Sequence, residues 1–313
     1  MIGPKAGWRV VVLALLVAAA AGCAQKRGNI PTGVTEPDKY LWEQGKAALD
    51  ERKWFTAREY FQQLVDNYPQ SPLRADAKLG VGDAYLNDGT TEGKLRAERE
   101  FEVFLSFFPT HQRADYAQYK LAMTHFDQMP KAERDQTETR AALDQFQAFR
   151  ERYPNSQLIG EVREKERIAR DRLSESIYKV GYFYHKARWY PGGISRFKQV
   201  LDEDPQFTNR DAVYFYLAEA YVALKREAEA LPLLEKLGAE FEQSEFLEKG
   251  AALREQVKAT LAQQTPGAPA GSPQTTAAAG AAVAPANPAP AAPATPAPAQ
   301  PATPDLRVKP PTP

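Results

Sequence analysis

Apolar residues between positions 37 and 262 recur every three or four residues, which is the spacing of one face of an α-helix. The clearest stripe consists of Trp54, Ala57, Phe61, Leu64, Val65 and Tyr68. Pro69 follows this stripe directly, and the helix is expected to end there because the residue before a proline avoids the α conformation. The same part of the sequence has no run of alternating β-branched residues. The pattern therefore predicts helices and no sheet.

The helical pattern also repeats along the chain. In four segments a phenylalanine lies eight residues before a proline, and a small residue lies four residues before the phenylalanine. The phenylalanines are Phe61, Phe101, Phe146 and Phe197, and the small residues are Ala57, Ala97, Ala142 and Gly193. A fifth copy lacks the proline and keeps apolar residues at Ala230, Leu234 and Phe241.

A period of roughly 34 to 50 residues indicates stacked helix pairs, each of which buries its apolar face only against its neighbours. We therefore predict an all-α fold, a tetratricopeptide-repeat solenoid of about five helix pairs. The four repeat phenylalanines are expected to be equivalent core residues between stacked helices.

The segment from Ser156 to about Lys186 contains no proline, while apolar residues continue at helical spacing. A helix of ~30 residues would be ~45 Å long. It would run from the second helix of one repeat into the first helix of the next, and so fuse repeats three and four. Its dense charges are expected on the solvated face, with pairs at i,i+4 spacing such as Glu161–Lys165 and Glu166–Arg170.

The composition changes sharply near Thr265. From there to Pro313 the chain is almost entirely Ala, Pro, Thr, Gly and Gln, and it carries 14 of the 25 prolines. Prolines remove amide donors, and a segment without large apolar groups cannot form a core. We predict a disordered tail over residues 263–313, a repeat domain over 37–262 and a short polar linker over 23–36.

Cys23 is the only cysteine in the 313 residues. Lys5 and Arg9 precede an apolar run of about a dozen residues, which is typical of a secretory signal and too short to span a membrane. The run leads into Ala20-Ala21-Gly22-Cys23, which resembles a bacterial lipobox with alanine in place of the usual leucine. We expect a lipoprotein signal over residues 1–22 and acylation of Cys23. The alternative is an ordinary cleaved signal with an incidental cysteine.

Charge and composition exclude several kinds of function. The chain has 40 basic and 40 acidic residues, and zero net charge argues against nucleic acid or an anionic membrane surface as the general partner. The three histidines, His111, His125 and His185, are scattered, and none lies four residues from another. The sequence also has no nucleophile elbow or phosphate loop. We therefore expect no catalytic site, no metal and no cofactor.

Three segments carry a resemblance to a known family. They are Pro109-Thr110-His111 followed by Asp115, Tyr116 and Tyr119; Tyr153-Pro154-Asn155-Ser156 before the long helix; and Arg170-Asp171-Arg172-Leu173 leading into Tyr182-Phe183-Tyr184. With an N-terminal anchor and five repeats, they resemble the YfiO/ComL family, also called the BamD family, which consists of lipoproteins of the β-barrel assembly machinery. The resemblance covers residues 37–245.

The resemblance implies a non-enzymatic scaffold and receptor for the assembly and insertion of β-barrel proteins into the outer membrane. Its lipid anchor would hold it at the periplasmic face, and Ala24 after the cysteine fits outer-membrane sorting. Repeats from about 170 to 245 would dock on the barrel subunit BamA, with Arg188 and Arg196 as candidate residues.

The resemblance also implies that the repeats from about 37 to 130 bind the C-terminal strand signal of unfolded barrel proteins. The candidates for this peptide site are Tyr85, Asp115, Tyr116 and Tyr119. Each of them has packing between repeats as its alternative role.

Two other classes stay open from the sequence. A different tetratricopeptide lipoprotein, such as a pilus-assembly pilotin or a coordinator of envelope constriction, would share the anchor and the repeats. It would have no reason to carry the Pro-Thr-His block or the fused helix. An enzyme has little support, since acidic pairs on helix faces are expected for solvation alone.

Overall fold

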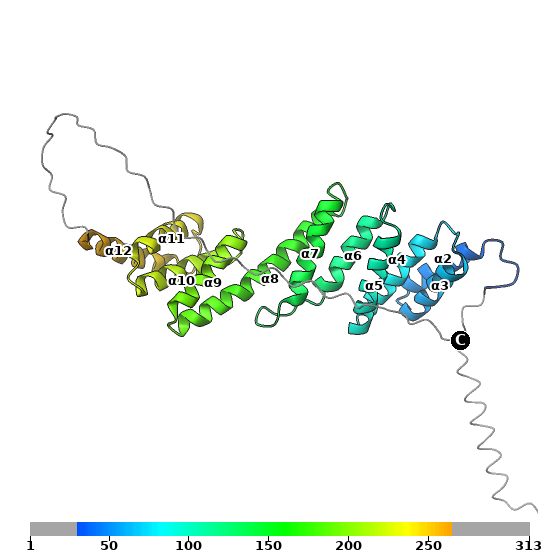
Figure 1. The fold of residues 1–313 in the computed structure, drawn as a ribbon, viewed down its shortest axis with the longest axis horizontal. Coiled ribbons are helices and arrows are strands. Elements are labelled where there is room, and N and C mark those ends of the chain that lie inside the picture. The colour runs from blue at the N-terminus through cyan, green and yellow to red at the C-terminus, as the bar shows by residue number, and fades with distance from the viewer. Residues whose placement is uncertain (1–29, 265–313) are drawn as a thin grey trace, which may run out of the picture. The chain divides into compact units, whose positions relative to one another are not determined.

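The computed structural model describes residues 30–264, and over this range it contains eleven α-helices and no strand (Figure 1). The helices are α2 (Pro37–Asp50), α3 (Trp54–Asn67), α4 (Arg74–Asp88), α5 (Thr91–Phe107), α6 (Ala114–Phe126), α7 (Thr137–Arg152), α8 (Ile159–Lys186), α9 (Tyr190–Glu203), α10 (Arg210–Ala223), α11 (Glu227–Glu240) and α12 (Leu247–Gln264). The predicted all-α fold is confirmed. The predicted signal, Cys23 and the tail from residue 265 onward lie outside the described residues.

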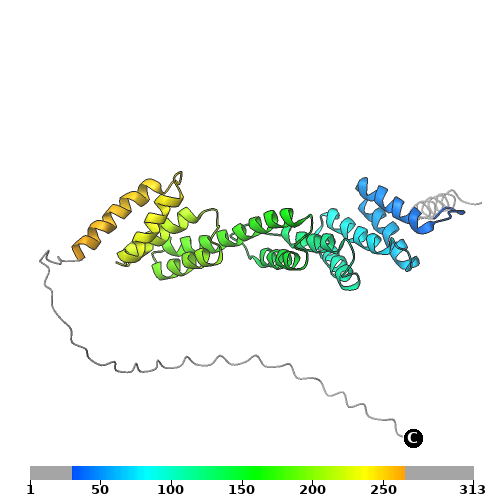
Figure 2. The same cartoon turned by 90° about the horizontal axis from the view of Figure 1, so that it is seen from above.

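Each helix from α2 to α11 packs against the helix that follows it in the chain (Figures 1 and 2). Helices two apart also touch, for example α2 with α4 and α8 with α10, so one pair stacks on the next. The pairs are α2–α3, α4–α5, α6–α7, α8–α9 and α10–α11, and α12 packs on the last of them. This arrangement confirms the predicted stack of about five helix pairs.

The four repeat phenylalanines are fully buried, as predicted. The ring of Phe61 lies between Gly45 of α2 and Gly80 of α4, and a Cβ added at either glycine would come within 2.5 or 2.6 Å of the ring. Gly181 faces Phe197 in the same way. The glycines therefore provide the space that lets the helices close around the rings of Phe61 and Phe197.

Four of the five turns between paired helices contain a residue with left-handed backbone. After α2, α8 and α10 this residue is Arg52, Arg188 or Lys225, with φ of 59°, 59° and 58°, and after α4 it is Gly89, with φ of 74°. Glycine adopts this conformation freely, whereas other residues hold it only where the surrounding structure requires it. Arg188, a predicted docking residue, is therefore a turn residue with an exposed side chain.

Helix α8 has 28 residues, which confirms the predicted long helix. In both views it lies between α7 and α9, and it packs on both. Glu166 and Arg170 form the predicted i,i+4 pair at 3.0 Å. The predicted pair of Glu161 with Lys165 is wrong, because Glu161 accepts a hydrogen bond from Tyr119 and Lys165 lies over the ring of Phe126 at 5.5 Å.

Candidate functional site

Three of the four predicted peptide-binding residues, Asp115, Tyr116 and Tyr119, lie together on α6. The Tyr116 hydroxyl donates to both carboxylate oxygens of Asp83 on α4, at 2.8 and 2.9 Å. The Arg113 guanidinium and the Lys120 ammonium lie over the Tyr116 ring, 4.5 and 5.4 Å from its centre. Tyr116 therefore links α6 to α4 through a polar contact surrounded by positive charge.

Burial dominates the electrostatics of the pair formed by Asp83 and Tyr116. Asp83 is only 8% exposed, and this burial raises its pKa, although Lys120, the Tyr116 hydrogen bond and Arg113 partly offset the effect. The pKa of Tyr116 is also raised, first by burial and then by the negative charge of Asp83. Tyr116 therefore stays protonated and remains a donor across the ordinary pH range.

Asp115 belongs to a polar contact that recurs along the stack. Its Oδ2 accepts a 2.6 Å hydrogen bond from Ser156 Oγ, which in turn accepts from the backbone N–H of Leu158 just before α8. The same kind of contact occurs twice more. Ser71, before α4, donates to Asp38 in the first turn of α2, and Ser244, before α12, donates to Asp211 in the first turn of α10. We call these three Asp–Ser contacts the turn latches. Asp115 therefore helps to hold α8 against α6.

Tyr119 is nearly covered, with 7% of its surface exposed, and its hydroxyl donates to Glu161 of α8. Burial, and then the hydrogen bond to Glu161, raise its pKa. The α6 residues thus connect α4, α6 and α8 and have the packing role that was their alternative. Their part in peptide binding stays a prediction.

The fourth candidate, Tyr85, lies on α4 and not on α6. It lines a cavity of about 280 Å³ between α3, α4 and α5, together with Phe55 and Arg58. The guanidinium of Arg58 lies 4.6 Å from the centre of the Tyr85 ring, and that of Arg96 lies 5.7 Å from it. Arg58 also pairs with Asp88 at 3.0 Å. The positive charges of this cavity are therefore balanced by its own carboxylates.

A second cleft in the first repeats was not predicted from the sequence. It has a volume of about 310 Å³ and lies between α3, α4 and α5, lined by Gln62, Val65, Asp66, Arg74, Lys78, Val103, Phe107 and Phe108. Phe107 is 74% exposed, although a large aromatic side chain usually lies in the core. Two consecutive phenylalanines at a helix end were the available signal, because the helical pattern buries only one of them. We call this cavity the α3–α5 cleft.

The predicted docking arginines lie at the start of the last repeats. Arg188 is in the turn after α8, and Arg196 is exposed on α9, where it donates to Gln199 at 2.8 Å. The sequence analysis proposed no aromatic residue for docking, although Phe183 near the end of α8 and Trp189 in the turn after it are exposed. Trp189 packs edge-on against Tyr184, with 4.6 Å between ring centres. Phe183 also lies against Tyr184, with 5.8 Å between ring centres, so aromatic side chains gather near the turn that carries Arg188.

Within residues 30–264 no group of three or more His, Cys, Asp or Glu side chains is arranged to hold a metal ion. No helix in the same range is both long enough and apolar enough to cross a membrane.

Comparisons with known proteins identify a family and several relatives of this chain. Residues 35–262 match the model of the YfiO family, which is described as an outer membrane lipoprotein. The outer membrane protein assembly factor BamD of Caulobacter vibrioides is 32% identical over 225 residues, covering 71% of this chain and 72% of that protein. BamD of Vibrio cholerae is 25% identical over 195 residues, covering 59% and 78%. Among solved structures, MamA aligns with a TM-score of 0.30 at 16% identity, covering 67% and 98%.

The paired and stacked helices define an all-helical repeat protein of the tetratricopeptide type. Within this class the family match is specific, because it spans nearly all of the described residues. The chain belongs to the YfiO family of outer membrane lipoproteins, the family of the assembly factor BamD. The match decides against the pilotin and the constriction coordinator that the sequence pattern alone left open.

Proposed function

We propose that this protein is a non-enzymatic scaffold and receptor for the assembly and insertion of β-barrel proteins into the outer membrane. The observation that carries the proposal is the family match over residues 35–262, because the relatives that match most of the repeat domain are named outer membrane protein assembly factors. The fold is suited to this role, since it offers separate surfaces before and after α8.

The α3–α5 cleft is our candidate for the C-terminal strand signal of an unfolded barrel protein. An extended peptide needs pockets for its apolar side chains and polar partners for its ends. Phe107 and Phe108 supply aromatic contact, and Arg74 and Lys78 supply positive charge for a terminal carboxylate. Lys78 already pairs with Glu100 at 2.5 Å, so a bound carboxylate would compete with that contact.

The surface around Arg188 and Arg196 is our candidate for docking on a BamA-like barrel subunit. Tryptophan and arginine are enriched among the residues that carry most of the energy of protein interfaces. Trp189 exposes 54% of its surface and Phe183 exposes 67%. Together with Arg188 and Arg196, this part of the molecule therefore offers exposed tryptophan and exposed arginine.

The proposed membrane attachment is acylation of Cys23, which lies outside the described residues. Acyl chains contribute about 0.8 kcal/mol per buried methylene, so two or more chains hold a protein firmly on a bilayer. Cys23→Ser should release the protein from the membrane fraction or leave it unprocessed. Mass spectrometry of the native protein checks the assignment, and an unmodified Cys23 or cleavage at another site would contradict it.

Binding measurements on surface variants test the proposed function. Phe107→Ser with Lys78→Glu should weaken a C-terminal barrel peptide and spare BamA periplasmic domains. Leu95→Ser is the matched control, because Leu95 is also exposed on α5 and lies outside the cleft lining. Asp115→Lys with Tyr119→Ala would be a poorer probe of peptide binding, because both side chains hold helices together.

Arg188→Glu with Arg196→Glu should weaken BamA domains and spare the peptide. Arg52→Glu is its control, since Arg52 holds the same left-handed turn conformation in the first repeat. Circular dichroism verifies that every variant is folded. The proposal fails if the native protein binds neither partner, and the assignment of surfaces fails if folded variants of both kinds lose both partners or neither.

A further inference from the structure

Helix α8 is attached to the repeats before it along most of its length. Glu161 accepts from Tyr119 of α6, and Glu166 pairs with Arg150 of α7 at 2.8 Å. Further along, Arg172 donates to the carbonyl oxygen of Pro130 at 2.9 Å, and Lys179 pairs with Glu133 in the same connection between α6 and α7. Contacts with the preceding repeats therefore extend as far as residue 179.

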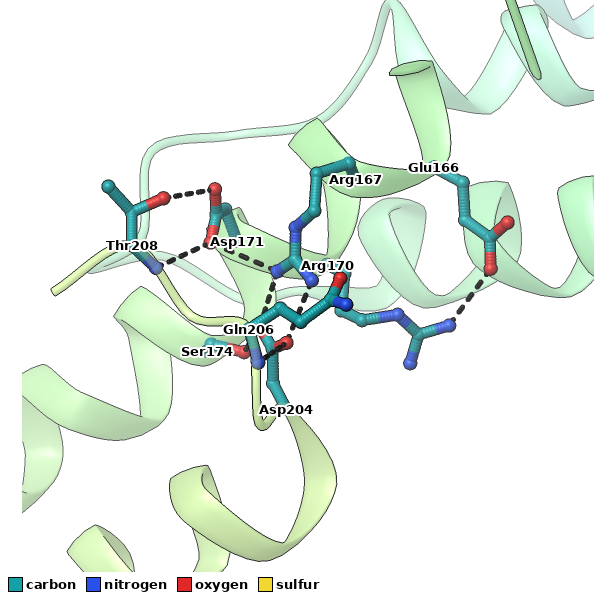
Figure 3. Close-up of polar contacts among 8 residues, drawn as sticks. All are labelled: Glu166, Arg167, Arg170, Asp171, Ser174, Asp204, Gln206 and Thr208. Atoms are coloured by element: carbon teal, nitrogen blue, oxygen red, sulfur yellow. Dashed lines mark hydrogen bonds and ion pairs between the residues drawn. The ribbon is translucent and has the colours of Figure 1, made fainter. Parts of the chain in front are cut away.

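Contacts with the repeats after α8 begin twelve residues earlier, at Arg167. Its guanidinium donates hydrogen bonds to both carboxylate oxygens of Asp204, in the turn between α9 and α10. It also donates to Asp171 at 3.0 Å (Figure 3). Ser174 donates to Asp204 at 2.7 Å, and Thr208 donates to Asp171 from its hydroxyl at 2.6 Å. The two sets of contacts thus overlap between residues 167 and 179.

The overlap has a mechanical consequence. A helix bends where its hydrogen-bond ladder or its packing is interrupted. Between residues 167 and 179 a bend would separate α8 either from the 130–133 connection on one side or from the α9–α10 turn on the other. We propose that this shared segment of α8 is a rigid joint, meaning a segment in which α8 does not bend. Arg167 and Asp204 are the positioning residues that fix the orientation of the last repeats relative to the first. The proposal does not depend on the identity of the partners.

Asp204 is an exception among the repeats. The residue before the repeat proline is aromatic in the first three copies, where it is Tyr68, Phe108 or Tyr153. Asp204 takes that place in the fourth copy, is 2% exposed and also accepts from the backbone N–H of Gln206. A buried ion pair adds little net stability over apolar packing, although it can select one geometry. At this one repeat a bidentate ion pair replaces the aromatic ring. The ion pair therefore fits a role in fixing the geometry between α8 and the last repeats.

Distance measurements between spin labels in the full chain test the joint. With Cys23→Ser as background, labels at Glu43→Cys and Glu235→Cys report across α8, and both positions are exposed. A bend of about 20° moves a point ~30 Å away by ~10 Å, which such labels resolve. Label pairs at Glu43 with Asp144, and at Lys198 with Glu235, report within each half.

Arg167→Gln with Asp204→Asn removes the charges and keeps side chains of similar size. We expect the distance distribution across α8 to broaden or shift, while the distributions within each half stay unchanged. Arg58→Gln with Asp88→Asn is the matched control, because it removes another partly buried interhelical ion pair, between α3 and α4, and should leave the cross-α8 distance unchanged.

Arg167→Lys is the second variant. It keeps the charge and loses the bidentate contact, so it should also broaden the distance distribution across α8. It replaces the double variant in this test if circular dichroism shows that the double variant has lost helical structure. A distribution as narrow as that of the native protein in a folded variant would overturn the joint. Loss of partner binding with unchanged distances would contradict the joint as well, and it would leave the proposed function intact.

Discussion

Two buried aspartates, Asp83 and Asp204, have surroundings that shift their pKa in opposite directions. Burial raises the pKa of Asp83. Burial would also raise the pKa of Asp204, but hydrogen bonds from Arg167 and Ser174 outweigh it and lower the pKa. An aspartate in the unfolded chain titrates near 3.9, so folding changes the proton affinity of each group with opposite sign.

The first prediction concerns Asp83. As the pH rises from about 4 through the raised pKa, the unfolded carboxyl releases its proton before the folded one, and the folded state loses stability. Asp83→Asn does not titrate and still accepts from Tyr116. We expect the free energy of unfolding of this variant, relative to the native protein, to increase from pH 4 to pH 7. Urea unfolding at both values checks this, and a relative decrease would contradict the assigned electrostatics.

Asp204 should behave in the reverse sense. Its stabilising contribution is present above pH 4 and is lost as the pH falls through the lowered folded pKa. Asp204→Asn should therefore cost most at neutral pH, about 3 kcal/mol, the low end for a broken buried pair because Arg167 keeps 30% of its side chain exposed. The same urea series, extended to pH 3, should show this deficit shrinking. A deficit that grows on acidification would rule the account out.

The glycines around Phe61 give a steric prediction. Gly80→Ala would bring a Cβ within 2.6 Å of the Phe61 ring, and overpacking of this kind costs about 1–3 kcal/mol. Gly160→Ala is the control, because a Cβ at Gly160 in α8 meets nothing within 4 Å. It should be neutral or stabilise the helix by up to about 1 kcal/mol. Equal effects of the two substitutions would mean that the helices do not close around Phe61 as described.

At the scale of helices and turns, the turn latches are the contacts most open to test. Ser156→Ala removes both the hydrogen bond to Asp115 and the acceptor for Leu158, and it should cost about 1 kcal/mol or slightly more. Ser106→Ala, at an exposed position on α5, should lie within about 0.5 kcal/mol of the native protein. Thermal unfolding of both variants makes the comparison. If Ser156→Ala matches the control, the latch has no energetic role.

Local pattern was enough to predict the helices, the buried phenylalanines and the length of α8. Each of these depends on spacing within one helix or on a short offset to a proline. The Asp–Ser latches were not found, because their partners lie 33 or 41 residues apart and meet only after the repeats stack. The joint at Arg167 was missed for the same reason, since the charges of α8 were expected on a solvated face. Position on a helix does not say which charges a neighbouring element will cover.

The candidate peptide residues show the same limit. Tyr116 and Tyr119 were singled out by a motif, and the structure engages both hydroxyls in contacts between helices. The exposed Phe107 lies next to Phe108 at the end of α5, and only the packing of α3 and α4 reveals the cleft beside it. Aromatic residues outside the repeat phenylalanines cannot be assigned to a surface or to the core until the neighbouring helices are placed.

At the scale of the whole molecule, α8 determines how the first three repeats and the last two act together. Separate sites cooperate only where the connection keeps one at high effective concentration near the other. A chain split after Ser174 should fail to hold both partners on one particle, because Ser174 is buried inside the shared segment. A split after Gln70, between α3 and α4, is the control. Co-purification of both partners with the Ser174-split protein would show that the continuous helix is unnecessary.

The central claim is that two partners bind this protein at once through separate surfaces. The most direct measurement captures it on immobilised periplasmic domains of a BamA-like subunit and then titrates a labelled C-terminal barrel peptide. Independent sites have no coupling free energy, so the peptide should bind the captured protein with the same affinity as the free protein. Displacement of the protein by the peptide, or loss of peptide binding on capture, would contradict the account.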